Sequence, residues 1–226
     1  RRRSERLAAL TPEQRKQASL RPLLDIDEKT RAKIKSAVNQ ILRQQLPKGG
    51  WRYGTGSVPD FGDLADISST QYALLGLHAA TLLECPVEGK VFAKALSWIL
   101  AAQEADGPKS ARPGPEAAAA QPGQDTVAYT PAAQDRARGW TYVPSRKTGA
   151  EGMASGGTTA AAICCLVLCK SHLAGNAEVK GKAGIDPAIF DGFAWLHANW
   201  TVAENPKGSR SHFAYLYALE RAGVFG

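Results

Sequence analysis

Hydrophobic residues recur with a spacing near 3.6 in two stretches of the chain, about residues 28–45 and 87–103, which predicts two amphipathic helices. Each is followed, after a turn, by a stretch that is apolar at nearly every position, residues 69–83 and 157–173. A helix that is apolar on all sides needs neighbours on several sides. The pattern therefore predicts an all-α protein with outer amphipathic helices and inner apolar ones.

The two helix pairs are copies of one unit. Gly49-Gly50-Trp51-Arg52-Tyr53 recurs as Arg138-Gly139-Trp140-Thr141-Tyr142, between the two helices of each pair. Each tryptophan lies 19 residues before a threonine that opens the inner helix, Thr70 or Thr159. A shared motif at a constant distance from a shared helix start predicts an internal repeat.

A third, degenerate copy follows without the Gly-Trp motif. Asp186-Pro187 is typical of a helix start, with the aspartate as cap and the proline in the first turn. After an Asn205-Pro206 turn, residues 212–219 form a second apolar stretch. The predicted hairpins thus cover residues 27–84, 87–174 and 186–223.

Two segments interrupt this pattern. Residues 1–24 form a basic arm with a short helix predicted at 12–20, and residues 1–22 carry five of the seven net positive charges. Because the remaining chain is nearly neutral, nucleic-acid binding is not expected. Residues 106–137, rich in Ala, Pro, Gly and Gln and without periodicity, are predicted to be a flexible insertion.

The composition is that of one globular domain, with 44% hydrophobic and 22% charged residues among 226. No apolar stretch reaches the length of a membrane span, so we expect a soluble protein. Four cysteines without a disulfide pattern favour buried, reduced thiols and a cytoplasmic location. The chain begins at Arg1, so an upstream targeting segment would not be visible.

The combination of a polar outer helix, a glutamine followed by a Gly-Trp turn, and an apolar inner helix resembles the repeat of the prenyltransferase and squalene-cyclase superfamily. Gln45 with Gly50-Trp51 and residues 68–77 carry this resemblance, as does Gly139-Trp140 with residues 158–161. Residues 215–223 are similar to a sequence motif in uncharacterised bacterial members of this superfamily. The resemblance implies an (α/α) toroid whose inner helices line a cavity. Three hairpins would make only part of such a ring.

The cyclases of this family use a buried acid in an Asp-x-Asp-Asp cluster. Asp60, Asp63 and Asp66 are the nearest candidates here, at a spacing of three before an inner helix, but they do not reproduce that order. For Asp66 the favoured interpretation is helix capping. The family's prenyltransferases bind zinc, and Cys165, Cys169 and His172 share one face of an inner helix. Close packing is the favoured interpretation of these cysteines, and we expect neither a metal nor another cofactor.

Polar residues on the inner helices, mainly in their first turns, are the candidates for ligand binding: Gln71, His78, Thr158, Thr159, His212 and Tyr215. The Trp and Tyr residues of the Gly-Trp turns could stack on a ligand. They are more typical of residues that tie a turn to the neighbouring hairpin.

We therefore expect a repeat module that lacks the family's known chemistry and acts as a binding or interaction scaffold in a larger protein. One alternative is an isoprenoid cyclase or prenyltransferase with an apolar cavity. Another is a carbohydrate-active (α/α) barrel. The expected partners are an apolar or isoprenoid small molecule, a second copy of the chain, or the remainder of a longer chain.

Overall fold

The computed structural model describes residues 26–54, 64–110, 135–144, 153–174, 184–208 and 211–225. Within these ranges the chain forms six helices and one two-stranded antiparallel sheet. The helices are α3 (Glu28–Arg43), α4 (Ile67–Leu82), α5 (Gly89–Ala101), α6 (Gly156–His172), α7 (Ile185–Ala198) and α8 (His212–Phe225), and the strands are β1 (Lys109–Ser110) and β2 (Asp135–Arg136). The all-α prediction is confirmed, and the first four helices end within two residues of the predicted positions.

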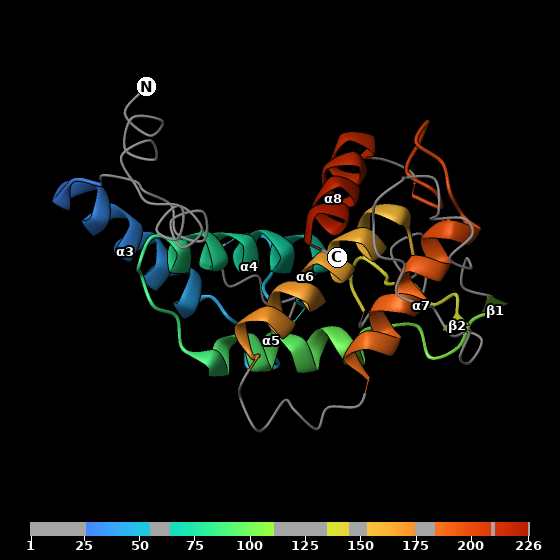
Figure 1. Cartoon of the computed structure of the whole chain (residues 1–226), viewed down its shortest axis with the longest axis horizontal. Coiled ribbons are helices and arrows are strands. Elements are labelled where there is room, and N and C mark those ends of the chain that lie inside the picture. The colour runs from blue at the N-terminus through green and yellow to red at the C-terminus, as the bar shows by residue number, and fades with distance from the viewer. Residues whose placement is uncertain are drawn as a thin grey trace, which may run out of the picture.

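Helix α6 lies at the centre of the molecule. It packs against α4 and α8, the other two apolar helices, and also against α5 and α7 (Figure 1). Helix α3 packs against α4. Apolar residues gather on one side of α3 and α5 but are spread around α4, α6 and α8. These five helices therefore divide into the amphipathic and apolar sets that the polarity pattern predicts.

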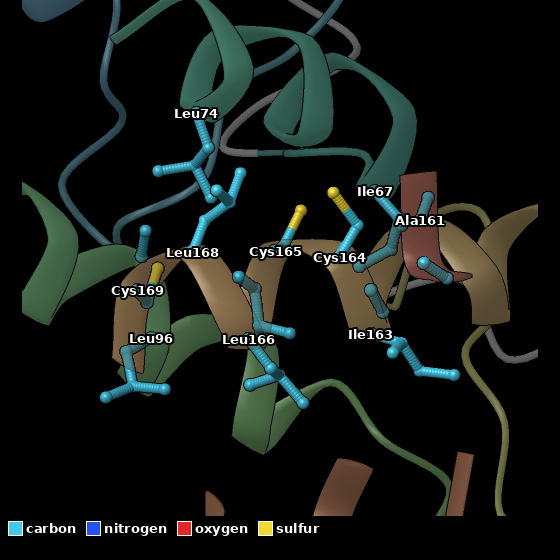
Figure 2. Packing of buried hydrophobic residues seen from close by; sticks show 14 of the residues in the cluster. Ile67, Leu74, Leu96, Ala161, Ile163, Cys164, Cys165, Leu166, Leu168 and Cys169 are labelled. Atoms are coloured by element: carbon cyan, nitrogen blue, oxygen red, sulfur yellow. The ribbon is translucent and has the colours of Figure 1, made fainter. Parts of the chain in front are cut away.

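The core is built around α6. Cys164 and Cys165 point towards α4, whereas Leu166 points towards α5 (Figure 2). All three side chains are fully buried, as is Cys169 on the same helix. Burial raises the pKa of the Cys165 thiol well above its usual range, because a thiolate would lose its hydration there. These cysteines act as small hydrophobic side chains.

The two Gly-Trp turns make the same hydrogen bonds. The Trp51 backbone N–H donates to Thr70 Oγ1 (3.0 Å), and that of Trp140 donates to Thr159 Oγ1 (3.2 Å). Each indole Nε1 donates over 2.8 Å to a carbonyl of the preceding outer helix, Ile41 O for Trp51 and Ile99 O for Trp140. Both indoles are buried, so these tryptophans tie each turn to its outer and inner helices.

A glutamine then ties each outer helix to the next one. Gln45 Nε2 donates to Val91 O in α5 over 2.9 Å, and Gln103 Nε2 donates to Ala188 O in α7 over 3.0 Å. Each amide also bonds within its own turn, to Gly49 O or to Arg138 O. One polar side chain thus connects consecutive hairpins in both copies.

The turn before α8 has different residues but a comparable role. Pro206 O accepts a hydrogen bond from the Gly156 N–H (2.9 Å) at the start of α6, and Asn205 Oδ1 accepts one from the Gly157 N–H (2.8 Å). At the corresponding place in the preceding unit, the Ile67 N–H donates to Tyr142 O (3.1 Å). Every inner helix that is followed by a further turn is therefore bonded to that turn.

Two predictions are wrong in part. Helix α7 starts at Ile185 after Gly184, whose φ of +144° suits glycine, so Asp186 lies inside the first turn and does not cap the helix. There the Asp186 carboxylate pairs with Lys170 Nζ at 2.6 Å.

The predicted flexible insertion is also too long at both ends, because Lys109 and Ser110 of β1 pair with β2. Beside β2, Arg138 donates two hydrogen bonds to Asp191 Oδ2, at 2.6 and 2.8 Å. Asp191 is buried, and its Oδ1 accepts a hydrogen bond from the Arg136 N–H at 2.7 Å. The Arg138–Asp191 ion pair and the hydrogen bond from the Arg136 backbone N–H therefore hold the C-terminal end of the predicted insertion against α7. Residues 111–134 and the arm at 1–24 lie outside the described residues.

None of the helices in the described ranges is long and apolar enough to cross a membrane.

Candidate functional site

A cleft of about 370 Å3 opens where α4, α6 and α8 meet the turns that precede α6 and α8. Its polar lining consists of hydroxyl and amide side chains and one lysine, and its apolar lining is formed mainly by alanines and tyrosine rings. The lining residues are Ser68, Gln71, Tyr72, Tyr142, Met153, Ser155, Gly157, Thr158, Ala161, Asn205, Lys207, Gly208, Ser211, Ala214, Tyr215 and Ala218.

Three of the six residues proposed from the sequence as ligand contacts lie in this cleft: Gln71, Thr158 and Tyr215. Thr158 and Tyr215 already have partners within the protein. Thr158 Oγ1 donates to Trp140 O (2.5 Å), and Tyr215 Oη donates to Thr201 O (2.7 Å). Burial raises the pKa of Tyr215, which keeps its hydroxyl protonated and able to donate. Thr158 and Tyr215 therefore form fixed parts of the cleft wall, with their hydroxyl protons already donated to the protein.

Gln71 differs from them because its amide nitrogen has no hydrogen-bond partner. The side chain is 2% exposed, and Nε2 is fully buried. Cys164 lies beside it, and burial raises the pKa of that thiol to about 11, while a side-chain hydrogen bond from Gln71 lowers it by less. A neutral thiol is a weak acceptor, so the amide remains without a strong partner. Because Nε2 has no accessible surface, it is not within reach of a molecule in the cleft.

The other candidates have structural roles elsewhere. Thr159 Oγ1 accepts the Trp140 N–H, and His212 Nε2 lies 2.9 Å from Val202 O. Asp66 caps α4, because its Oδ1 accepts from the Ser69 N–H (2.7 Å) and its Oδ2 from the Tyr53 N–H (3.2 Å). Capping was the interpretation that the sequence favoured for Asp66. Asp60 and Asp63 lie outside the described residues.

His78 lies away from the cleft, against His172. His78 Nδ1 and His172 Nε2 are 3.0 Å apart, Phe92 stacks on His172, and the edge of Phe225 meets His78. Burial lowers the pKa of both histidines, and the neighbouring charge of His78 lowers that of His172 further. Cys165, Cys169 and His172 do not converge, and no three His, Cys, Asp or Glu side chains in the described ranges form a possible metal site.

Few charged groups lie at the cleft, and the nearest carboxylate belongs to Asp66, whose Oδ1 accepts a hydrogen bond from Ser68 Oγ of the lining (2.9 Å). No Asp or Glu occurs among its described lining residues, and Lys207 is their one charged side chain. Helices α6 and α8 both begin at the cleft without an acidic residue in the first turn, so their positive dipole ends are uncompensated. Lys207 and Ser211 both have positive φ values, 56° and 68°, a strained conformation that recurs at binding sites.

Sequence reasoning missed the residues contributed by the third turn, Asn205, Lys207 and Ser211. That turn lacks the Gly-Trp motif, so nothing in the repeat marked it as part of a site. The position of this turn, between the predicted outer helix of the third unit and its inner helix, could have indicated the site. Equivalent turns in a repeat meet the same end of the inner helices. The arrangement can bind and orient a small molecule by hydrogen bonding and apolar contact.

Comparison with known proteins yields no match for this chain among family models, curated proteins or solved structures.

Proposed function

We propose that this chain is a repeat module of the prenyltransferase and squalene-cyclase type that binds a small molecule in the cleft at the start of its inner helices, without the family's known chemistry. The observation that carries the proposal is a cleft of about 370 Å3 whose lining combines alanines and tyrosine rings with hydroxyl and amide side chains. Ligand pockets have this size and combine an apolar lining with a few polar groups.

The link between consecutive hairpins supports the repeat assignment. Gln45 and Gln103 occupy matching positions and donate to matching carbonyls of the next outer helix, Val91 O and Ala188 O. Repetition of the same bond between successive units is what a curved helical repeat requires, because each unit contacts only its neighbours. The matching hydrogen bonds of the glutamine and the tryptophan in the two copies therefore support the proposed assignment.

The residues that line the cleft favour binding of a small molecule over isoprenoid cyclisation or prenyl transfer. A hydrocarbon substrate calls for an apolar cavity, whereas hydroxyl and amide groups form much of this cleft. A cyclase also needs an acid, and the described lining contains no carboxyl group. Asp66, the described member of the predicted acid set, accepts hydrogen bonds as a helix cap.

The test combines turnover and binding on the full chain. Farnesyl diphosphate and squalene are incubated separately with the protein, and products are sought by mass spectrometry; we expect none. In parallel, a mixture of small polar fragments is titrated into isotope-labelled protein, and we expect shifts of resonances from Gln71, Thr158 and Ala214. A cyclised or prenylated product, or a fragment set that leaves all cleft resonances unmoved, would contradict the proposal.

A second candidate function is association through α8. Phe213, Tyr217 and Val224 share one face of this helix and are 86%, 40% and 61% exposed. Its sequence is apolar all round, as in α6, but its extensive contacts among the described helices are with α6. A second copy of the chain, packed on this face, would supply the neighbour that an inner helix has elsewhere.

A further inference from the structure

Two serines bring hydroxyl oxygens to the cleft from the starts of neighbouring inner helices. Ser68 lies in the first turn of α4, and Ser155 is the cap of α6. Both line the cleft, and both are only partly buried. A serine hydroxyl has one proton to donate and two lone pairs that accept. What each serine offers to a ligand therefore depends on where its proton is already used.

The Ser68 proton is directed into the protein. Ser68 Oγ donates to Asp66 Oδ1 over 2.9 Å, whereas Tyr142 Oη is more distant at 3.4 Å. A carboxylate binds a donor more strongly than a neutral hydroxyl does, and 3.4 Å is long for a bond between two hydroxyls. The lone pairs of Ser68 Oγ are what remains for a molecule in the cleft.

The Ser155 proton is directed into the protein as well. Thr158 Oγ1 donates to Trp140 O over 2.5 Å and lies 2.9 Å from Ser155 Oγ. Because the single Thr158 hydroxyl proton goes to Trp140, Ser155 is the donor in the contact between the two hydroxyls. Both series of hydrogen bonds thus begin at the cleft and end on an acceptor. A ligand group that meets either serine oxygen has to donate, and each bond in the series strengthens the next.

Among ligand donors, a hydroxyl suits the cleft better than an ammonium group. Lys207 is the one charged side chain among the described lining residues, and its Nζ lies 5.4 Å from the centroid of the Trp195 ring. A second positive charge in the cleft would be repelled by Lys207. A hydroxyl is neutral, and its lone pairs can also accept from Lys207. A carboxylate or an ether has no proton to donate.

Exposed tyrosine rings form the apolar part of the cleft. Tyr72 and Tyr142 both line it and are 56% and 37% exposed. The Tyr72 ring stacks on Tyr217 at a centroid distance of 5.9 Å, which holds it in place, and Ala161 and Ala214 add small side chains to the lining. A saturated ring with C–H groups on its face and hydroxyls at its edge can pack on a tyrosine ring while its hydroxyls reach polar atoms. Sugar rings are built in this way.

We propose that the cleft binds a neutral sugar ring, whose hydroxyl groups donate to Ser68 Oγ and Ser155 Oγ and whose C–H face packs on the Tyr72 ring. This inference rests on the proposed function of the chain as a ligand-binding module and adds the chemical class of the ligand. Hydrolysis of the sugar is not part of it, because the described lining contains no pair of carboxyl groups.

The first experiment compares neutral sugars with analogues that cannot donate. The methyl α- and β-pyranosides of glucose, galactose and mannose are titrated into the full chain, each paired with its fully O-methylated derivative. Binding is followed by the backbone resonances of Ser68, Ser155 and Ala214. We expect at least one pyranoside to bind with a dissociation constant of about 1 mM, and its methylated derivative to bind at least about tenfold more weakly. Equal or tighter binding of the methylated derivative would overturn the proposal.

Two further outcomes separate this inference from the proposed function. If all six pyranosides fail to bind while other polar fragments shift the cleft resonances, the sugar class is wrong and the ligand-binding cleft remains. If neither group of compounds binds, both are wrong. Methyl glucosaminide tests the charge, because it adds an ammonium group to the same ring. It should bind more weakly than methyl glucoside, and tighter binding would overturn the neutral class.

The second experiment removes the two serine oxygens. Ser68→Ala should lower the affinity for the best pyranoside by about threefold to tenfold, and so should Ser155→Gly, in which glycine remains acceptable as a helix cap. Ser69→Ala is the matched control, because Ser69 lies in the same turn of α4 but is not among the lining residues. It should leave the affinity as it is. Unchanged affinity in one serine variant would contradict the contact given to that serine, and unchanged affinity in both would overturn the proposal.

The third experiment tests the ring contact. Tyr72→Phe keeps the ring and should keep the affinity, whereas Tyr72→Ala should lower it at least about fivefold. Tyr53→Ala is the control, since Tyr53 is 91% exposed and lies outside the cleft lining, and it should have no effect. Equal affinity of Tyr72→Ala and the wild-type chain, or an equal loss in Tyr72→Phe and Tyr72→Ala, would contradict packing of the sugar on this ring.

Discussion

Helices α6 and α8 have the same kind of sequence but different surroundings. Both carry apolar residues on every side, yet nearly all of α6 is buried, while the buried residues of α8 are Tyr215, Ala218 and Ala222. The reason is the number of neighbours: α6 packs against four helices, whereas α8 packs mainly against α6. An apolar sequence therefore indicates that a helix can be enclosed, and the arrangement of other elements determines whether it is.

The turns before the two helices differ as well. Trp140 bonds both to Thr159 of α6 and to Ile99 of the preceding outer helix. Before α8, the link comes from the helix itself, because Tyr215 Oη donates to Thr201 O in the turn. A turn and an inner helix can thus be joined by a side chain of the turn or by a side chain of the helix. Only the first arrangement, with its Gly-Trp pair, leaves a recognisable sequence motif.

The largest effect is expected from truncation inside α6. Leu166 is fully buried, so Leu166→Ala should lower the free energy of unfolding by about 2–5 kcal/mol through lost transfer energy and a cavity. Val224→Ala on α8, where the side chain is 61% exposed, should change it by less than about 0.5 kcal/mol. Urea denaturation followed by circular dichroism measures both. Equal losses would show that α8 is as enclosed as α6.

The tryptophan links should come next. Trp140→Phe and Trp51→Phe each remove a 2.8 Å hydrogen bond from the indole to a helix carbonyl, which is buried for Ile99 O and partly buried for Ile41 O. We expect each to lower the free energy of unfolding by about 1–3 kcal/mol. Trp200→Phe is the control in the third turn, because Trp200 is 61% exposed, and it should be nearly neutral. A similar loss in all three variants would contradict the distinct role of the Gly-Trp turns.

A smaller loss of stability is expected when the pH is lowered, because His78 and His172 meet at the junction of α6 with α4 and α8. Burial lowers both pKa values from the ordinary 6.5, so the unfolded chain takes up protons first as the pH falls. The stabilisation is complete above about pH 6.5 and is lost as the pH drops towards the lowered pKa values. We expect the melting temperature to fall as the pH is lowered from about 6.5 towards the lowered pKa values of the folded protein.

His172→Gln should reduce this acid dependence, whereas His197→Gln, at an exposed histidine of α7, should leave it as it is. Thermal denaturation at a series of pH values gives the slopes for the three proteins. An unchanged slope in His172→Gln would mean that other groups cause the loss of stability.

The smallest effect on stability, but a distinct effect on assembly, is expected from the exposed face of α8. Phe213→Ser should change the free energy of unfolding of the monomer by less than about 0.5 kcal/mol, since Phe213 is 86% exposed. It should shift the sedimentation behaviour towards the monomer. Leu82→Ser, at an exposed residue of α4, should not. A wild-type chain that remains monomeric at high concentration would contradict association through α8.

Local patterns predicted much of the fold because helix formation depends on near neighbours. Period and polarity predicted the helices to within about two residues in the first two units, and the shared distance from tryptophan to threonine corresponds to a hydrogen bond present twice. The start of α7 was misplaced because Asp186-Pro187 is a good capping pattern, whereas Gly184 precedes the helix with a positive φ. The ends of the insertion were missed because a two-residue strand has too few residues to show alternation.

The site was only half predictable for a related reason. Gln71, Thr158 and Tyr215 could be named because inner helices begin near them, but Lys207 and Ser211 lie on a turn without a motif. His78 looked like a cavity residue from its place on an apolar helix, yet it packs against His172, 94 residues away in the chain. Contacts between distant residues depend on how helices are placed, and no local pattern encodes that placement.

The amino-acid order thus accounts for the helices, for their division into amphipathic and apolar sets, and for the capping role of Asp66, since each of these depends on residues within a few turns of one another. The enclosure of α6, the exposure of α8 and the unpartnered amide of Gln71 come from the packing of helices that are far apart in the chain. Burial is a property of all the atoms that surround a side chain, so it exists only once those helices have come together.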